Sequence, residues 1–233
     1  MELSKPIHPD DGMDGDDWTP LLMHAPNADP LYNKRSKRLL DVAGALALLL
    51  LAGPLMLLIA AVIRAGGGPA VFRHRRIGAR GRPFLCLKFR TMHVDAREML
   101  RRHLEADPAA LAEWNASFKL KNDPRITPLG RFLRRTSLDE LPQLFNVLAG
   151  DMSLVGPRPI VPEEIDRYGG LFGFYAYCRP GLTGIWQISG RSDVDYHQRI
   201  AFDRQYVARW SLFLDLRIIL STPKVFLARS GAY

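Results

Sequence analysis

VAGALALLLLAGPLMLLIAAVI, residues 42–63, is an uncharged run rich in leucine and alanine, and it decides how the chain is organised. Its length matches the ~20 apolar residues that a helix needs to cross a bilayer. Residues 46–51 are apolar on every side of a helix, which argues against a helix packed in a soluble core. The sequence therefore predicts a membrane helix here.

Basic residues lie on both sides of this run, at 34–38 and at 64–76. The positive-inside rule places each flank in the cytoplasm, which a helix that crosses once cannot satisfy. Gly53-Pro54 stands in the middle of the run, and proline removes a backbone hydrogen bond and kinks a helix. We therefore expect a kinked, re-entrant helical hairpin over 34–68, and the alternative is a spanning helix with a proline kink.

The rest of the chain divides into a tail and one domain. Residues 1–33 are acidic and interrupted by proline and glycine, so we expect a disordered tail without a secretory signal. Residues 69–233 predict an α+β domain that is mainly helical, and the helix at 95–106 either lies on the membrane surface or packs on the core. The expected strands are 71–72 and 83–89, around a basic turn at 78–81, and the further helices are 108–114, 196–210 and 212–228.

The charge of the chain favours anionic partners. Its 233 residues carry a formal charge of +8, which suits phosphorylated substrates, acidic lipid headgroups or nucleic acid. A nucleic-acid binder rests on charge alone, because the sequence lacks the interleaved aromatic and basic residues of RNA modules. Cys86 and Cys178 stand too far apart for a metal motif and indicate no disulfide framework.

The candidate chemistry is concentrated in residues 119–159, which hold the acidic pair Asp139-Glu140. Residues 137–140 fit a capping box with Ser137 as the cap. Proline is favoured at the first position of a helix, however, so Pro142 indicates a later helix start. A helix N-terminus would keep a carboxylate ionised, an ionised Asp139 could be a nucleophile, and Glu140 could hold a hard divalent cation. From the residues alone, capping is the stronger interpretation.

Cations surround this pair in the sequence. Arg134 precedes it, Arg158 lies in a turn-like GPRP, and Lys88 and Arg90 end the strand at 83–89. Such groups bind phosphate oxygens and neutralise charge at a reacting phosphate, although most single arginines belong to a solvated face.

A later block, RPGLTGIWQISGR at 179–191, carries two further candidates. Trp186 and Gln187 could contact a base or a sugar, whereas tryptophan is more often a core residue.

Taken together, the motifs resemble the bacterial sugar transferase family, also called the monotopic phosphoglycosyl transferases. The resemblance rests on five motifs, which are KRLLDVAGALALLLLAGPL at 37–55, FRHRRIG at 72–78, FLCLKFRTM at 84–92, NDPRITPLGRFLRRTSLDELPQLFNVLAGDMSLVGPRP at 122–159 and the RPGLTGIWQISGR block. Within the family, the chain is most similar to the short enzymes that prime exopolysaccharide synthesis, the undecaprenyl-phosphate galactose phosphotransferases.

The resemblance implies a two-step transfer of hexose-1-phosphate. Asp139 would attack the β-phosphate of a UDP-sugar and release UMP, and undecaprenyl phosphate would then take the phosphohexose. Glu140 would hold the family's Mg²⁺, and Arg134 and Arg158 match phosphate-binding arginines. Pro54 matches the break in the re-entrant helix, where many relatives have Ser-Pro and this chain has Gly53-Pro54.

The resemblance also implies a location and partners. We expect the chain in the bacterial cytoplasmic membrane, with its catalytic domain on the cytoplasmic face, in contact with anionic lipid and with a second copy as a further possible partner. No motif distinguishes galactose from glucose. The competing function is a membrane-anchored scaffold in which the acidic pair only caps a helix.

Overall fold

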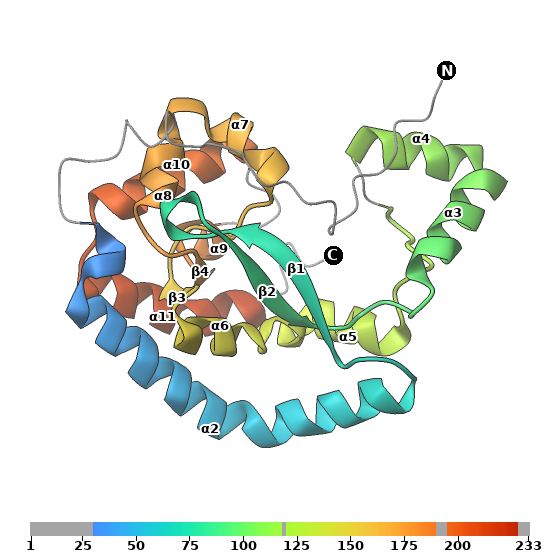
Figure 1. Ribbon diagram of the computed structural model, residues 1–233, viewed down its shortest axis with the longest axis horizontal. Coiled ribbons are helices and arrows are strands. Elements are labelled where there is room, and N and C mark those ends of the chain that lie inside the picture. Colours follow the sequence, from blue (N-terminus) through green and yellow to red (C-terminus); the bar gives the residue numbers. More distant parts are fainter. Residues whose placement is uncertain (1–29, 118–119, 190–194, 228–233) are drawn as a thin grey trace.

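The computed structural model describes residues 30–117, 120–189 and 195–227, so nearly all of the predicted acidic tail lies outside the described residues. The described part is mainly helical with a few short strands, as predicted (Figure 1). In its first half, the elements are η1 (Leu31–Asn33), α2 (Arg35–Ala65), β1 (Val71–Ile77), η2 (Ala79–Gly81), β2 (Pro83–Phe89), α3 (Ala96–Ala106), α4 (Pro108–Ser117), α5 (Pro128–Thr136), η3 (Leu138–Glu140) and α6 (Gln143–Ala149). The second half holds β3 (Ser153–Val155), η4 (Pro162–Glu164), α7 (Ile165–Tyr168), η5 (Gly169–Leu171), α8 (Phe172–Ala176), β4 (Gly181–Thr183), α9 (Ile185–Ile188), α10 (Tyr196–Ala208) and α11 (Leu212–Leu227).

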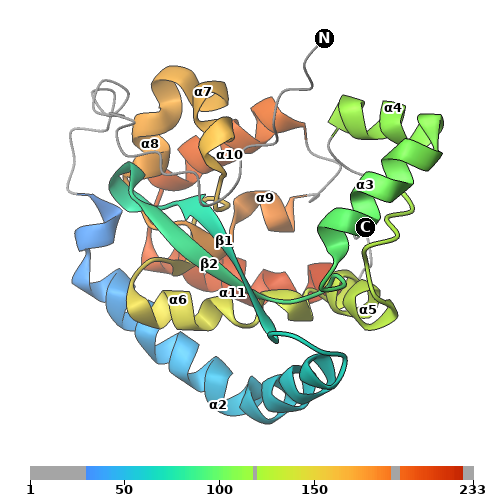
Figure 2. The same ribbon diagram turned by 45° about the vertical axis from the view of Figure 1, so that its right-hand side comes forward.

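The predicted membrane segment forms one uninterrupted helix, α2, with Pro54 inside it. Two separate helices joined by a loop, as in a hairpin, are therefore absent from residues 34–68. The ribbon of α2 changes direction partway along in both Figure 1 and Figure 2, as expected of a helix that contains proline. Among the described helices, α2 alone is long and apolar enough to cross a membrane by length and composition.

One side of α2 packs against the rest of the molecule from end to end. Its buried residues follow a helical stripe: Lys37, Asp41, Ala45, Met56, Ile59 and Ile63. The other sides expose large apolar side chains: Leu39, Leu46, Leu48, Leu50, Leu51, Leu55, Leu57, Leu58 and Val62. Because both ends of α2 touch the same domain, the helix lies along that domain and does not project from it.

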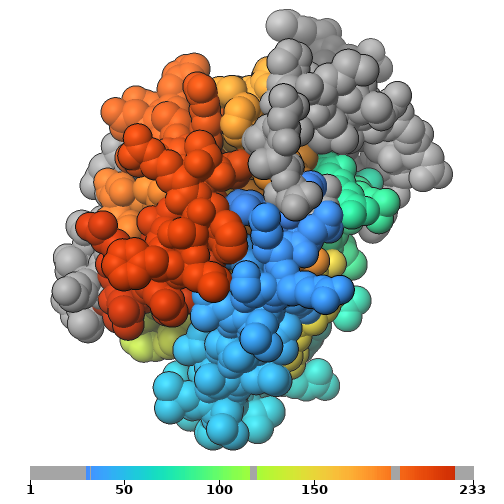
Figure 3. All heavy atoms as spheres, turned by 90° about the vertical axis from the view of Figure 1, so that its left-hand side faces the viewer, coloured from blue at the N-terminus to red at the C-terminus, as the bar shows by residue number. Residues whose placement is uncertain are grey.

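A buried polar network fixes the start of α2. Lys37 Nζ donates to Asp215 Oδ2 of α11 at 2.9 Å and to the carbonyl oxygen of Val155 at 3.0 Å. The hydroxyl of Tyr206 donates to the other oxygen of Asp215 at 2.8 Å. On the next turn, Asp41 Oδ1 accepts from the Leu154 backbone N–H at 2.9 Å. These bonds join α2 to β3 and α11, and Figure 3 shows α2 and α11 side by side on one face.

The strands β1 and β2 form an antiparallel hairpin that runs across the molecule (Figures 1 and 2). The register pairs Phe72 with Lys88 and His74 with Cys86, so these side chains share one face of the hairpin. The first strand extends five residues beyond the predicted 71–72, through the charged stretch 73–77. The predicted turn is present, and Arg80 takes a positive φ of 60° there.

A second, parallel pair, β3 and β4, lies inside the body, where α6, α8, α10 and α11 surround it. The predicted helices at 196–210 and 212–228 correspond to α10 and α11, and Ala228 lies outside the described residues. The predicted 95–106 and 108–114 correspond to α3 and α4, which project from the body away from α2 (Figures 1 and 2). This placement does not favour a membrane-surface role for α3.

Candidate active site

A left-handed turn brings the acidic pair into place. Helix α5 ends at Thr136, and the next residue, Ser137, reverses the chain with a φ of 56° and a ψ of 17°; its N–H donates to the Arg134 carbonyl oxygen at 3.2 Å. Asp139 and Glu140 follow directly in the single turn of η3, just before α6. The predicted position of the pair, at or just before a helix start, is confirmed.

Helix α5 is held against the segment that follows β2. The Thr127 hydroxyl caps α5 by accepting from the Gly130 N–H at 2.9 Å, and the Thr127 N–H donates to the Thr91 carbonyl oxygen at 3.1 Å. A Cβ on Gly130 would lie 1.9 Å from that same oxygen, so the close approach requires glycine. Arg134 Nε then donates to the Thr91 hydroxyl at 2.9 Å. Arg134 is thereby positioned one turn before the acidic pair.

Helix α6 is held against β2 by one amide side chain. Asn146 Nδ2 donates to the Leu85 carbonyl oxygen at 2.8 Å, and Asn146 Oδ1 accepts from the Leu87 N–H at 2.9 Å. The amide thus pairs with the strand as a neighbouring strand would. This contact fixes the distance between Lys88 on β2 and the acidic pair before α6.

The two carboxylates have different partners. Glu140 Oε1 accepts from Lys88 Nζ at 2.6 Å. The side chain of Ser137 makes no capping hydrogen bond, so the capping box predicted for 137–140 is wrong. The pair therefore does not serve as a helix cap, which removes the main structural argument for the scaffold alternative.

Asp139 is the more buried of the two, with 8% of its surface exposed. Burial raises its pKa to about 6, Glu140 adds to the increase, and the cations of Lys88 and Arg134 oppose it. The sequence predicted an ionised carboxylate here but not its burial, which raises the pKa toward neutrality. At pH 7 the group is still mostly ionised, with a cation on either side.

Further cations continue along the hairpin face that carries Lys88. Burial raises the pKa of the Cys86 thiol to about 11. The charges of Lys88, Arg76, Glu140 and Arg158 lie close enough to affect this pKa as well. Burial, Arg76 and Lys88 lower the pKa of His74 to about 4, so this imidazole is neutral at pH 7. Lys88, Arg76 and Arg158 therefore form a track of positive charge that starts at the acidic pair; we call it the cation track.

Arg90 has a different position. Its Nη2 donates to the carbonyl oxygens of Ile63, at 3.2 Å, and Gly67. These acceptors belong to the end of α2 and the turn after it. The structure thus brings together Lys88, Arg134, Asp139 and Glu140, places Arg158 farther along the cation track, and directs Arg90 to the end of α2.

The acidic pair also fits part of a magnesium site. In the described ranges no three side chains of His, Cys, Asp or Glu cluster as a ready-made metal site. Mg²⁺ in phosphoryl-transfer sites commonly takes one or two carboxylates and completes its shell with water and substrate phosphate oxygens. Asp139 and Glu140 are adjacent carboxylates of the right kind, with the cations of Lys88 and Arg134 beside them.

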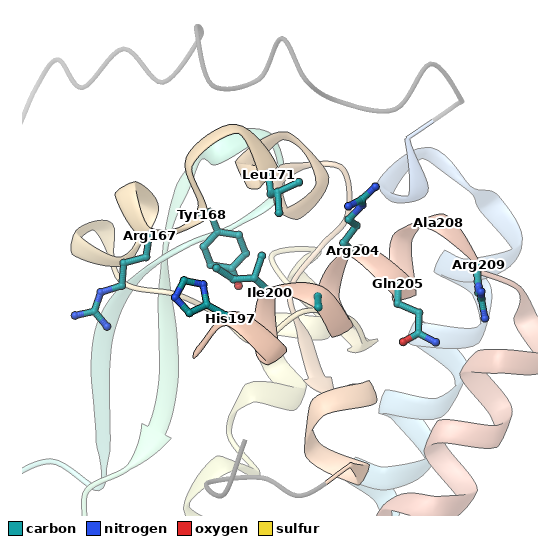
Figure 4. Close-up of a pocket in the computed structure, with 10 residues that line it drawn as sticks. Arg167, Tyr168, Leu171, His197, Ile200, Arg204, Gln205, Ala208 and Arg209 are labelled. Carbon is teal, nitrogen blue, oxygen red and sulfur yellow. The ribbon is translucent and has the colours of Figure 1, made fainter. Parts of the chain in front are cut away.

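Two pockets of about 410 Å³ lie elsewhere. Figure 4 shows one between α7 and α10, lined among others by Arg167, His197 and Arg204. The other lies at the hairpin turn beside Arg80 and Arg179. None of the predicted site residues lines either pocket.

The arrangement can stabilise negative charge at a reacting phosphate and can supply an anionic oxygen to attack it. Thr91 and Asn146, which position Arg134 and β2, were not predicted as site residues. Their role depends on contacts between distant segments, and neither residue carries a recognisable local pattern. The alternation of His74 and Arg76 on one strand face was the available signal for the cation track.

Comparison with known proteins agrees with the motifs. A family model described as bacterial sugar transferase matches residues 32–229. The chain is 53% identical over 197 residues to the undecaprenyl-phosphate galactose phosphotransferase of Salmonella typhimurium, which covers 84% of this chain and 41% of that protein. It is 52% identical over 200 residues to the exopolysaccharide production protein ExoY of Rhizobium meliloti, over 85% of this chain and 88% of that protein.

A third relative is named for a different sugar. The chain is 44% identical over 206 residues to the UDP-glucose:undecaprenyl-phosphate glucose-1-phosphate transferase of Caulobacter vibrioides, over 84% of this chain and 72% of that protein. The chain spans less than half the length of the Salmonella relative.

Proposed function

Because the chain belongs to the bacterial sugar transferase family, we propose that it transfers hexose-1-phosphate from a UDP-sugar to undecaprenyl phosphate as the priming step of exopolysaccharide synthesis. The observation that carries the proposal is the buried carboxylate of Asp139, held beside Glu140 and between the cations of Lys88 and Arg134. The names of the relatives supply the substrate classes, with galactose and glucose both represented.

The proposed reaction has two displacements at one phosphorus. An oxygen of Asp139 attacks the β-phosphorus of the donor, and the bond from this phosphorus to the bridging oxygen breaks, so UMP leaves with that oxygen. An aspartyl phosphohexose remains. A phosphate oxygen of undecaprenyl phosphate then attacks the same phosphorus, which frees the carboxylate and gives the diphosphate-linked hexose. No net proton transfer is needed in either step.

The cations make this attack of an anion on an anion feasible. Arg134 is fixed by Thr91 and can contact the phosphate next to Asp139 through its remaining N–H groups. Lys88 is already held at the site by Glu140. Preorganised donors of this kind stabilise charge that develops in the transition state. Arg158, farther along the cation track, is placed for the phosphate that leaves.

We include Mg²⁺ in the proposal, held by Glu140 together with Asp139 or the substrate phosphates. When bound, the ion neutralises phosphate charge and orients the diphosphate. Glu140 has a second part in the unbound enzyme, because it pairs with Lys88 and keeps that ammonium group at the site.

The proposed location is the cytoplasmic membrane surface, with α2 re-entrant. Three observations support it: the exposed leucines of α2, the contact of both its ends with one domain, and basic residues at both ends. If α2 crossed the bilayer, the part of the domain that packs against both of its ends would have to lie in the lipid as well. A shallow helix instead lets the lipid acceptor and the water-soluble donor reach one site from their own phases.

The test uses the full chain in detergent or nanodiscs with undecaprenyl phosphate and a panel of UDP-sugars, scored by UMP release. Transfer with UDP-galactose or UDP-glucose is expected, and the preferred sugar identifies the donor. A scaffold would release no UMP from any donor, and that result would refute the proposal. Chelation of divalent cations followed by addition of Mg²⁺ tests the metal in the same assay.

A further inference from the structure

Helix α9 presents two side chains away from the core. Ile185 and Ile188 pack against the main hydrophobic core. In a helix, Trp186 and Gln187 then lie on the opposite side. The ring of Trp186 meets the guanidinium groups of Arg199, at 4.8 Å, and of Arg158, at 5.7 Å. This places α9 at the far end of the cation track from Asp139.

Three polar atoms in this place are buried without a hydrogen bond. They are Nε1 of Trp186, Oε1 of Gln187 and Nε of Arg199, and none has a partner within the described parts of the chain. Buried polar groups are nearly always paired, so an unpaired one requires an explanation, and a bound ligand is one. Arg199 contacts the ring of Trp186, and Gln187 follows Trp186 in the chain, so the three residues together offer two donors and one acceptor. We call these residues the base cluster.

Two donors and one acceptor are also the groups that would pair with the edge of uracil. The imide edge of uracil carries two carbonyl acceptors with an N–H donor between them. The N–H groups of Trp186 and Arg199 can donate to the carbonyl oxygens, and Gln187 Oε1 can accept from the N–H. We propose that the base cluster binds the nucleobase of the nucleotide-sugar donor. The inference rests on the proposed function and adds to it the residues that select the nucleotide.

The distance along the hairpin fits a nucleoside diphosphate. Lys88 marks the end of the cation track at Asp139, and Arg76 stands opposite Phe84, four residues back along β2. At about 3.3 Å per residue, that interval is roughly 13 Å. Arg158 lies beside Arg76 and also against the ring of Trp186. A donor with its base on α9 would therefore lay its diphosphate along the cations and present its β-phosphorus at the acidic pair.

Wild-type enzyme alone gives the first test, by calorimetric titration of the full chain in nanodiscs. UMP should bind more tightly than ribose 5-phosphate, which lacks the base, and more tightly than CMP, whose ring nitrogen accepts where uracil donates. The monophosphate of 5-methyluridine keeps the imide edge and should bind like UMP. Equal affinity for UMP, CMP and ribose 5-phosphate would overturn the inference.

Single variants give the second test. Trp186→Phe keeps an aromatic ring but removes the N–H, and Gln187→Met removes the acceptor at similar size. Each should weaken UMP binding roughly threefold to tenfold, the range for one neutral hydrogen bond, and leave ribose 5-phosphate binding unchanged. Trp114→Phe on α4 is the matched control and should bind UMP like the wild type. If both base-cluster variants keep the full preference for UMP, Trp186 and its arginines are only a structural stack.

The two proposals fail separately. An enzyme that prefers UMP over CMP but releases no UMP from any UDP-sugar keeps the base cluster and loses the transfer reaction. An enzyme that transfers sugar phosphate but binds UMP and CMP equally keeps the reaction and loses the base cluster.

Discussion

Replacing Asp139 with asparagine should abolish activity and, at neutral pH, make the protein more stable. Asp139→Asn keeps the shape of the side chain but removes the anionic oxygen that attacks phosphorus. Wild-type enzyme given UDP-sugar without lipid acceptor should carry a phosphohexose on Asp139, visible as an increase in intact mass and mapped by peptide sequencing. The variant should form no adduct and release no UMP.

The stability change follows from the pKa of Asp139. Its pKa is about 6 in the folded protein against an ordinary value of 3.8, and at 1.36 kcal/mol per pKa unit this difference amounts to about 3 kcal/mol. The folded state binds more protons between these values, so stability of the wild type falls as the pH rises from about 4 to 6. The variant lacks this fall. Above pH 7 it should be more stable by up to about 3 kcal/mol, or several degrees in thermal midpoint.

The assay is thermal unfolding of both proteins in one detergent from pH 4 to 8, with Asp166→Asn, at an exposed position, as the control. The difference between wild type and Asp139→Asn should be small near pH 4 and should widen to its full size by pH 7, while the control stays parallel to the wild type. A constant difference would refute the raised pKa. Wild-type rates of UMP release from the variant would refute the assignment of Asp139 as the nucleophile. Activity of the wild type should rise with pH through about 6 for the same reason.

Three further changes test other parts of the structure. Arg134→Ala should slow adduct formation by roughly 10²–10³, the usual effect of one preorganised donor, whereas the exposed Arg135→Ala should not; equal rates would make Arg134 a surface charge. Pro54→Leu should push α2 toward spanning, so that cysteines introduced at 34–38 become reactive to an impermeant thiol reagent from the periplasm; unchanged protection would mean that Pro54 does not set the topology. Asp215→Ala should destabilise the fold by about 3–5 kcal/mol in denaturation measurements, because it breaks the buried 2.9 Å ion pair and leaves Lys37 with only the more distant carboxylate of Asp41, at 4.0 Å; Lys37→Met in the same chain should recover part of that loss.

The sequence was most informative where the signal is local. The apolar run at 42–63, the hairpin turn and the helices 196–208 and 212–227 follow from composition and periodicity, and the structure has them close to the predicted bounds. The strand β1 was predicted too short because its later residues are charged. Their side chains alternate between the two faces of the hairpin. The face with His74 and Arg76 becomes part of the site only through contacts with β2 and the acidic pair, which the local sequence does not reveal.

The candidate site shows the same limit. The positions of Asp139 and Glu140 near a helix start were predictable, but the pattern at 137–140 suggested a capping box that the left-handed turn at Ser137 prevents. The raised pKa of Asp139 could not be predicted, because its burial depends on β2 and α5, which pack over the pair from distant parts of the chain. The amide of Asn146, which pairs with the backbone of β2, could not be read from its neighbours in sequence.

Because one stripe of α2 packs on the domain, α2 cannot be replaced by an unrelated hydrophobic helix. Met56, Ile59 and Ile63 form one cluster with Phe89 of β2 and Leu133 of α5, the elements that carry Lys88 and Arg134. Removing residues 1–68 to obtain a water-soluble enzyme would therefore expose Phe89 and Leu133 and loosen the elements that support the acidic pair. A generic hydrophobic anchor fused in its place would restore attachment to the membrane without restoring catalysis.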